Sequence, residues 1–398
     1  MRTTLSKWDY LIVTASNALQ ASAYESQLAV RRGLGLLSDV REVMVVPDPG
    51  DRRVGSGGST LYCLMEVLSR RLGRKVRTSG PENWLSILRE LRILIVHAGG
   101  DSKRLPAYGP CGKIFVPIPG ESDGALGLTL FERQLPIYLG LPELPAGVGQ
   151  VVITSGDVML RFDPEEVRFA AEGVTGLGCY ALPAQGSRHG VFCVGDGDAV
   201  RLYLQKPAVA EQKKRGAIDA YGQICLDIGV MNFDARTAVK MLEVFGARAG
   251  GRGCGLTLGG EMGEAVLSRR LDFYREICCA MGSEAEKSEH ARSAQQAGSK
   301  WPKTLLGRVF KAFSGVPFSV RLLKRCDFLD FGASRSVIES GGRLVQEERG
   351  LSSVQSLLDI NNEVLPGGSV KGTSCWVEGC RTSDRGSLIS MSATLGLR

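Results

Sequence analysis

The sequence predicts an α/β protein with a mostly parallel sheet covered by helices on both faces. From Trp8 to about Cys279, β-branched and apolar runs alternate with helix-like stretches, which is typical of doubly wound α/β domains. Three segments also share one order, in which a strand is followed by a glycine turn and then by polar or charged residues. After about Ala333 the glycines become frequent and apolar residues recur at a spacing of six.

The strands are predicted from short β-rich runs bounded by turn residues. They lie in the segments DYLIVTAS, EVMVVPD, RILIVHAGG, QVVITSGD, GCYALPA, GVFCVG and GQICLDIGVMNFD. Helices are predicted between them, at residues 21–36, 60–71, 81–90 and 129–139. This arrangement predicts a three-layer domain over residues 1–281.

The second half of the chain changes character. Residues 282–300 are polar and lack apolar periodicity, so we expect a loop or linker within a connecting segment at 282–332. A spacing of six predicts a parallel β-helix over 333–398, because each coil turns a corner every five or six residues. An irregular all-β tail is the alternative. The residues at this spacing are Leu358, Val364, Val370, Trp376, Thr382 and Leu388.

Composition narrows the classes of function. The chain has 398 residues and a net charge of +7, which suits an anionic ligand, but its basic residues recur singly near glycine turns instead of forming a stripe for nucleic acid. No apolar run approaches the roughly 20 residues of a membrane span. Eleven cysteines without C-x-x-C spacing favour reduced thiols, so we expect a cytoplasmic protein that binds neither nucleic acid nor membrane.

The first glycine turn lies in PDPGDRRVGSGGSTL. Consecutive backbone N–H groups at the start of a helix can bind a phosphate, although such a turn can also be a simple connection. The predicted nucleotide-binding residues of this turn are Gly55, Ser56, Gly57, Gly58, Ser59 and Thr60.

The second turn lies in LIVHAGGDSKRLPAYGPCGK. It has neither dinucleotide-fold nor P-loop spacing. A glycine pair followed by Arg-Leu and a later Gly-Lys resembles the order in nucleotidyltransferases that act on sugar phosphates. We therefore expect Gly99, Gly100 and Ser102 to bind a nucleoside triphosphate, while Arg104 and Lys113 neutralise its phosphates.

The third turn, VVITSGDVML, ends a buried strand with a carboxylate. Asp157 stands where a hard cation such as Mg²⁺ could bind, although capping of the next helix is the alternative. One aspartate is a poor magnesium site, and Asp227 in CLDIGVMNFD is the predicted second ligand. Lys206 in YLQKP lies between these carboxylates in sequence and could bind the sugar phosphate.

Taken together, the chain resembles the fucose-1-phosphate guanylyltransferase family, also called GDP-fucose pyrophosphorylases. The resemblance rests on WDYLIVTASNALQASAYESQL, VPDPGDRRVGSGGSTL, VHAGGDSKRLPAYGPCGKIFVPIP, SGDVML, HGVF, LQKP, LDFYREI and FLDFGASRSVI. It implies a glycosyltransferase-A-like (Rossmann-like) nucleotidyltransferase domain and a short left-handed β-helix. It also implies transfer of GMP from GTP to L-fucose 1-phosphate, giving GDP-L-fucose and pyrophosphate with Mg²⁺ as cofactor.

Two features keep alternatives open. Asp330 and Ala333 stand where the family pattern leads us to expect histidine and threonine. Spacing also cannot reveal the choice of base or sugar, so another sugar 1-phosphate, such as a heptose or mannose phosphate, or a non-catalytic sugar-nucleotide-binding protein remain alternatives. The sequence is silent on oligomeric state.

Overall fold

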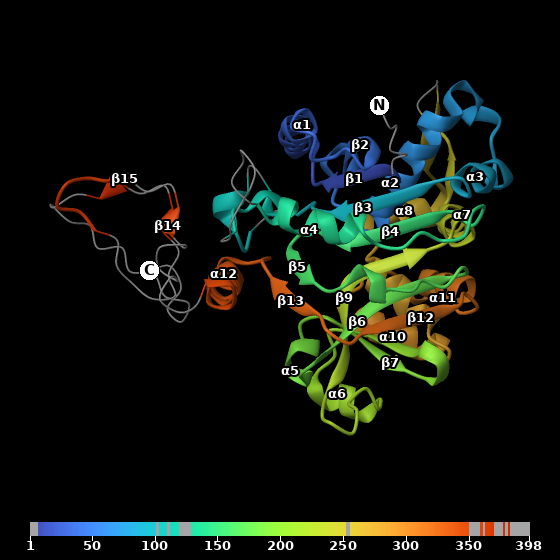
Figure 1. Ribbon diagram of the computed structural model, residues 1–398. Coiled ribbons are helices and arrows are strands. Elements are labelled where there is room, and N and C mark those ends of the chain that lie inside the picture. Colours follow the sequence, from blue (N-terminus) through green and yellow to red (C-terminus); the bar gives the residue numbers. More distant parts are fainter. Residues whose placement is uncertain are drawn as a thin grey trace. The chain divides into compact units, whose positions relative to one another are not determined.

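The computed structural model (Figure 1) describes residues 7–100, 103–109, 112–118, 129–251, 255–349, 359–360, 363–369, 377–378 and 381–382. Its chain forms two compact units. Unit 1 comprises Met1–Gly100, Ile137–Ser155 and Arg161–Cys326, and unit 2 comprises Asp101–Pro136, Gly156–Leu160 and Asp327–Arg398. The nucleotidyltransferase domain predicted at 1–281 and the connecting segment predicted at 282–332 stay predictions from sequence.

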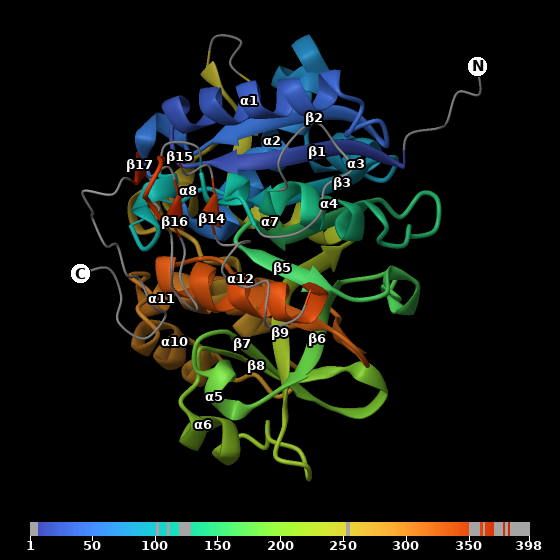
Figure 2. The same ribbon diagram turned by 60° about the vertical axis from the view of Figure 1, so that its left-hand side comes forward.

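Unit 1 contains a nine-stranded sheet with the order β12-β6-β9-β4-β3-β1-β2, in which β7 pairs with β8 and β9 (Figures 1 and 2). Strands β1 to β4 are mutually parallel, β12 is parallel to β6, and β9 runs antiparallel to β4 and β6. The strands are β1 (Trp8–Ala15), β2 (Val40–Pro47), β3 (Arg92–His97), β4 (Gln150–Ser155), β6 (Val174–Ala181), β7 (Gly190–Val194), β8 (Val200–Gln205), β9 (Ile224–Phe233) and β12 (Phe318–Leu323).

All seven predicted strands form, whereas β8 and β12 were not predicted. The four predicted helices also form, as α1, α2, α3 and α4. The helices are α1 (Ala18–Gly33), α2 (Gly55–Leu72), α3 (Pro81–Leu88), α4 (Leu130–Leu139), α5 (Pro183–Gly186), α6 (Val209–Lys214), α7 (Ala235–Val244), α8 (Gly260–Arg269), the π-helical turn η8 (Phe273–Cys278), α9 (Cys279–Met281), α10 (Lys287–Gln296) and α11 (Lys303–Phe313). Strands β10 (Ala247–Ala249) and β11 (Leu256–Leu258) form a separate antiparallel pair.

The core of unit 1 explains why its strands read as continuous apolar runs. Tyr10 and Ile12 of β1 pack in one cluster with Leu61 and Leu64 of α2. Successive strand residues point to opposite faces, and the intervening Leu11 is also fully buried. The sheet is therefore covered on both faces, as parallel strands require.

The polar segment at 282–300 is not the loop that we expect from its composition. It contains α10, which buries His290, Ala291 and Ala294 on one face. The two alanines, three positions apart, belong to the core of unit 1. Small apolar residues at helical spacing provide this face while the segment as a whole remains polar, so its composition does not indicate the helix.

Unit 2 has a small core of its own. Strand β5 (Val158–Arg161) pairs with β13 (Asp327–Asp330), and α12 (Ser334–Arg349) follows β13 directly. The core consists of Leu105, Tyr108, Val116, Ile118, Leu130, Met159, Leu329, Phe331, Val337 and Leu344. Residues 334–349 are thus helical and do not form β-helix coils, a correction to the predicted start at 333.

The tail beyond α12 is described only in short pieces. Strand β14 (Asp359–Ile360) is parallel to β16 (Val377–Glu378), and β15 (Glu363–Val364) is parallel to β17 (Arg381–Thr382). In both pairs the partners are separated by three of the six-residue periods. Val364 is 48% exposed, while Leu358, Val370, Trp376 and Leu388 lie outside the described residues.

Among the described residues, none of the helices combines the length and apolar character needed to cross a membrane. The cytoplasmic location stays a prediction.

Candidate active site

The second glycine turn begins at a topological switch point in unit 1. Strand β1 pairs with β2 on one side and β3 on the other, and ligands of open α/β sheets bind where the strand order reverses in this way. Backbone N–H groups of Ala98 and Gly99 donate to Thr14 Oγ1 at 3.1 and 3.2 Å. A Cβ atom on Gly99 would lie 3.3 Å from the carbonyl carbon of Ala15, so glycine permits this close approach.

Gly99 and Gly100 are the predicted nucleotide-binding residues that lie at this switch point. Gly99 is exposed, and the carbonyl of Gly100 accepts a hydrogen bond from Gln20 Nε2 at 3.5 Å. Ser102, the third predicted residue of this turn, lies outside the described residues.

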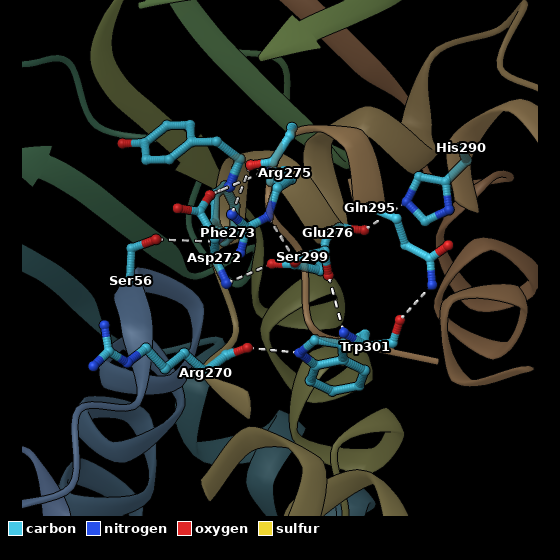
Figure 3. Close-up of polar contacts among 12 residues, drawn as sticks. Ser56, Arg270, Asp272, Phe273, Arg275, Glu276, His290, Gln295, Ser299 and Trp301 are labelled. Atoms are coloured by element: carbon cyan, nitrogen blue, oxygen red, sulfur yellow. Dashed lines mark hydrogen bonds and ion pairs between the residues drawn. The ribbon is translucent and has the colours of Figure 1, made fainter. Parts of the chain in front are cut away.

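The first glycine turn forms the start of α2 and packs against the LDFYREI segment. The N–H groups of Gly57 and Gly58 donate to the carbonyl oxygen of Leu271 at 2.9 and 3.3 Å, and Leu271 N donates to Val54 O at 2.7 Å. Ser56 Oγ accepts from Phe273 N at 2.9 Å (Figure 3). In this arrangement both glycine N–H groups are occupied, so binding a phosphate there requires Leu271 O to move, and the nucleotide role of Gly55 to Thr60 stays a prediction.

The last two residues of this turn contact the ends of strands β2 and β3. Ser59 Oγ donates to Asp48 Oδ1 at 2.7 Å. Asp48 is 5% exposed and pairs with Arg53 Nε at 3.0 Å, while burial raises the pKa of its carboxyl. Thr60 Oγ1 lies 3.1 Å from His97 Nε2 at the end of β3. These contacts fix the start of α2 beside the carboxyl ends of β2 and β3.

The LDFYREI segment is itself held by a polar network (Figure 3). Asp272 Oδ1 accepts from the N–H groups of Tyr274 and Arg275 at 3.0 and 2.9 Å and so caps η8. Asp272 N donates to Glu276 Oε2 at 2.7 Å, and the fully buried Glu276 pairs with Arg275 Nε at 2.7 Å. The segment that contacts α2 therefore has a fixed conformation.

Lys206 follows β8 in an unusual backbone conformation. Its φ is +52°, in the left-handed region, which costs a non-glycine residue about 1–2 kcal/mol. Its N–H donates to the carbonyl of His189 at 3.0 Å, and its side chain is exposed. Such strain is typical of functional sites, so it is compatible with the predicted sugar-phosphate role, which stays a prediction.

Asp227 is buried in β9 and bonded to protein groups. Its Oδ2 accepts from the Tyr203 hydroxyl at 2.6 Å and its Oδ1 accepts from Gly229 N at 2.7 Å. Only 5% of the residue is exposed. Burial raises the pKa of Asp227 to about 6, although the two hydrogen bonds oppose the shift.

We expect wild type to lose stability relative to Asp227→Asn as the pH rises from about 4 to about 6. The pKa of Asp227 is raised from its ordinary value of 3.8 to about 6 in the fold. Its stabilising contribution is therefore present below pH 3.8 and lost as the pH rises through 6. At about 1.4 kcal/mol per pKa unit, the total change is about 3 kcal/mol.

Urea unfolding curves at several pH values check this prediction. Asp219→Asn, at an exposed turn, is the control, and its free energy of unfolding should change with pH as that of wild type does. If the free energies of unfolding of wild type and Asp227→Asn change equally with pH, Asp227 ionises in the fold as readily as in the unfolded chain.

Unit 2 brings together two predicted site residues that are far apart in sequence. Lys113 lies in a 3₁₀ turn (Lys113–Phe115), and its Nζ is 3.6 Å from Asp157 Oδ2, at the start of the turn into β5. The same Nζ donates to the carbonyl oxygen of Gly332 at 2.7 Å. Of these two side chains, 15% of Lys113 and 33% of Asp157 are exposed. The ammonium group and carboxylate thus form a part-exposed pair.

Arg104 belongs to the same unit. Its carbonyl oxygen accepts hydrogen bonds from Ser334 N at 2.8 Å and Ser334 Oγ at 3.2 Å, and the residue is exposed.

Sequence reasoning noted Asp330 only as a departure from the family pattern. A Cβ atom on Gly332 would lie 2.7 Å from Asp157 Oδ2 and 3.0 Å from Asp330 Oδ1, so Asp330 is close to the predicted metal ligand.

The residues fit a magnesium ion only in part. Among the described residues, there is no group of three or more His, Cys, Asp or Glu side chains that could hold a metal. Mg²⁺ is often bound by one or two carboxylates together with substrate phosphates, so the part-exposed Asp157 could contribute. Asp227 fits less well because it is buried with both oxygens hydrogen-bonded. The two aspartates belong to different units.

The fold and these turns define the class of the protein as an α/β protein with a candidate phosphate site. Residues 86–393 match the family model described as the fucose pyrophosphorylase domain. The chain therefore belongs to the fucose pyrophosphorylase family, which confirms the resemblance seen in the sequence.

Several relatives are similar over parts of their length. A bifunctional fucokinase/GDP-fucose pyrophosphorylase of Arabidopsis thaliana is 29% identical over 59% of this chain and 24% of that protein. A fucose-1-phosphate guanylyltransferase of Mus musculus is 26% identical over 87% of this chain and 59% of that protein. An L-fucokinase/L-fucose-1-P guanylyltransferase of Bacteroides fragilis is 34% identical over 49% and 20%. The chain thus spans less than two thirds of the length of each of these relatives.

Proposed function

We propose that this chain transfers GMP from GTP to L-fucose 1-phosphate and releases GDP-L-fucose and pyrophosphate. Family membership and the names of the relatives support the reaction. The structural observation that carries the proposal is the Lys113–Asp157 pair in unit 2. Lys113 binds the carbonyl of Gly332, and the carbonyl of Arg104 binds the nearby Ser334. A cation and a carboxylate side by side suit a reaction between two polyanions.

In this proposal a phosphate oxygen of the sugar phosphate attacks the α-phosphorus of GTP in line. Such reactions need positioning and charge stabilisation more than covalent participation by the protein. Arg104 and Lys113 would bind the triphosphate and stabilise the charge that develops on departing pyrophosphate. Lys206 would bind the phosphate of the sugar, and the turns at Gly55–Thr60 and Gly99–Ser102 would contact the nucleotide.

We also propose Mg²⁺ as the cofactor, with Asp157 as a ligand and Asp227 as the weaker candidate for a second one. When bound, the ion would neutralise phosphate charge and align the reacting groups. Lys113 would then lie beside the metal ligand and could contact a phosphate oxygen at the same time.

We also propose a finer description of the fold, in which the sheet domain is glycosyltransferase-A-like and the tail forms coils of a left-handed β-helix. The parallel pairs β14–β16 and β15–β17, each joined across three six-residue periods, support the β-helix.

A substrate panel tests the activity. Each of the four common nucleoside triphosphates is combined with L-fucose, mannose and heptose 1-phosphates in the presence of Mg²⁺, and pyrophosphate release is measured. We expect the highest kcat/KM for GTP with L-fucose 1-phosphate. A clear preference for another pair would reassign the substrate, and binding of GDP-fucose without turnover of any pair would favour a non-catalytic protein.

A further inference from the structure

The turn between β13 and α12, residues 330–334, contacts three predicted site residues of unit 2. Lys113 takes part through its side chain, whereas Asp157 and Arg104 take part through their backbone carbonyl groups. The contacts are Phe331 N to Asp157 O at 2.8 Å, Lys113 Nζ to Gly332 O at 2.7 Å, and Ser334 N to Arg104 O at 2.8 Å. Segments that are distant in sequence therefore meet at one short turn.

Asp330 holds the conformation of this turn. Its Oδ1 accepts from Gly332 N at 2.7 Å and its Oδ2 accepts from Ser336 Oγ at 3.0 Å. Ser340 Oγ donates to the Asp330 carbonyl at 2.7 Å. The neighbouring Phe331 is fully buried in the core of unit 2. The turn is thus held by the Asp330 side chain, by hydrogen bonds to α12 and by the packing of Phe331 in the core.

A side chain at Gly332 would displace the neighbouring carboxylates. A Cβ atom there would lie 2.7 Å from Asp157 Oδ2 and 3.0 Å from Asp330 Oδ1, and unbonded atoms do not approach so closely without displacement. The absence of a side chain brings the Gly332 carbonyl and the Asp157 carboxylate to the same ammonium group.

We propose that residues 330–334 are a positioning element of the candidate site and that Asp330 is its positioning residue. The Asp330 carboxylate binds the N–H of Gly332, the residue whose carbonyl oxygen accepts from Lys113 Nζ, and the neighbouring residues Phe331 and Ser334 bind the backbone of Asp157 and Arg104. The catalytic meaning of this role rests on the proposed function, because only there does Lys113 act on the triphosphate.

Chemical labelling tests the positioning without any assay of activity. The full chain is treated with a limiting amount of an amine-acetylating reagent, and the extent of modification at each lysine is measured by mass spectrometry. In wild type, Lys113 should react more slowly than the exposed Lys7. In Asp330→Ala and Gly332→Ala, labelling of Lys113 should rise several-fold while that of Lys7 stays constant.

Kinetics then test the consequence for catalysis. We expect Asp330→Ala to lower kcat at least about tenfold, because a misplaced ammonium group stabilises the transition state less well. Asp330→Asn keeps an acceptor for Gly332 N and should recover most of kcat. In a Lys113→Met background Asp330→Ala should have a clearly smaller effect than in wild type, since residues that act through one another are not additive.

Arg335→Ala is the matched control. Arg335 is on the first turn of α12 and pairs with Glu339 on the exposed surface at 3.0 Å, so its replacement should leave Lys113 labelling and kcat unchanged. If Asp330→Ala does not fold, Gly332→Ala takes its place in every comparison.

The two proposals can fail separately. If wild type shows no turnover with any substrate pair, the proposed function fails, while the labelling result still decides whether the turn holds Lys113. Unchanged labelling of Lys113 in the folded turn variants would overturn the positioning proposal. So would a loss of kcat that is equally large with and without the Lys113 side chain.

Discussion

Replacing Lys113 by alanine is expected to lower kcat at least roughly a hundredfold, because loss of preorganised charge stabilisation has effects of this size. Lys113 Nζ lies between the Asp157 carboxylate and the Gly332 carbonyl, so its position is set before substrate binds. Pyrophosphate release with GTP and L-fucose 1-phosphate measures the change. Lys75→Ala, which removes the same charge from an exposed position in unit 1, is the control and should retain the wild-type rate.

Arg104→Ala is expected to give a loss of similar size for a related reason. The contacts from Ser334 reach the Arg104 backbone carbonyl, so the substitution removes the exposed guanidinium while the turn keeps its hydrogen bonds. A folded variant of either residue with a nearly normal rate would remove that residue from the mechanism.

The elements that the sequence predicts correctly are those with strong local signals. Strands β1, β3, β4 and β9 are buried apolar runs bounded by turn residues, and α1 and α2 follow with helical spacing. Their periodicity depends only on which residues face the core. Strand β8, VRLYLQ, was missed because Arg201 and Gln205 interrupt its apolar residues and only two of its positions are buried.

The candidate site could be predicted only as a set of residue types. Glycine turns, Arg104, Lys113 and Asp157 can be read from spacing, but their partners cannot. The carbonyl of Gly332 contacts Lys113 across 219 residues, and no local pattern specifies such a pairing. In the same way, the N–H groups at the start of α2 are occupied by Leu271, which the sequence alone gives no reason to expect.

In the tail, the predicted β-helix begins earlier than the six-residue spacing of apolar residues. Glycines become frequent from Ala333, yet residues 334–349 form α12, whose buried Val337 and Leu344 are spaced by seven residues. The six-residue pattern begins only with Leu358, and the described strand pairs begin at Asp359. Composition changes earlier than structure does, so the predicted start was too early.

Gly55→Ala is expected to destabilise the protein by about 3 kcal/mol. Gly55 has a φ of +81°, and a Cβ atom there would collide with the carbonyl oxygen of Leu271. The left-handed conformation costs a non-glycine residue of order 1–2 kcal/mol, and overpacking against fixed backbone adds about 1–3 kcal/mol. Denaturant unfolding without nucleotide measures the loss. Gly33→Ala, where no atom lies within 4 Å of the added Cβ, should be neutral or slightly stabilising.

This comparison also separates two roles for the first glycine turn. If its glycines serve to pack α2 against the Leu271 peptide, Gly55→Ala will lose stability in the absence of any ligand, and GTP affinity will fall only as far as folding does. If their N–H groups also bind phosphate after Leu271 moves away, GTP affinity of the folded variant will fall by more than the loss of folded protein explains. The hydrogen bonds from Gly57 and Gly58 to Leu271 O favour the first result, because a buried carbonyl that loses both donors costs about 1–3 kcal/mol.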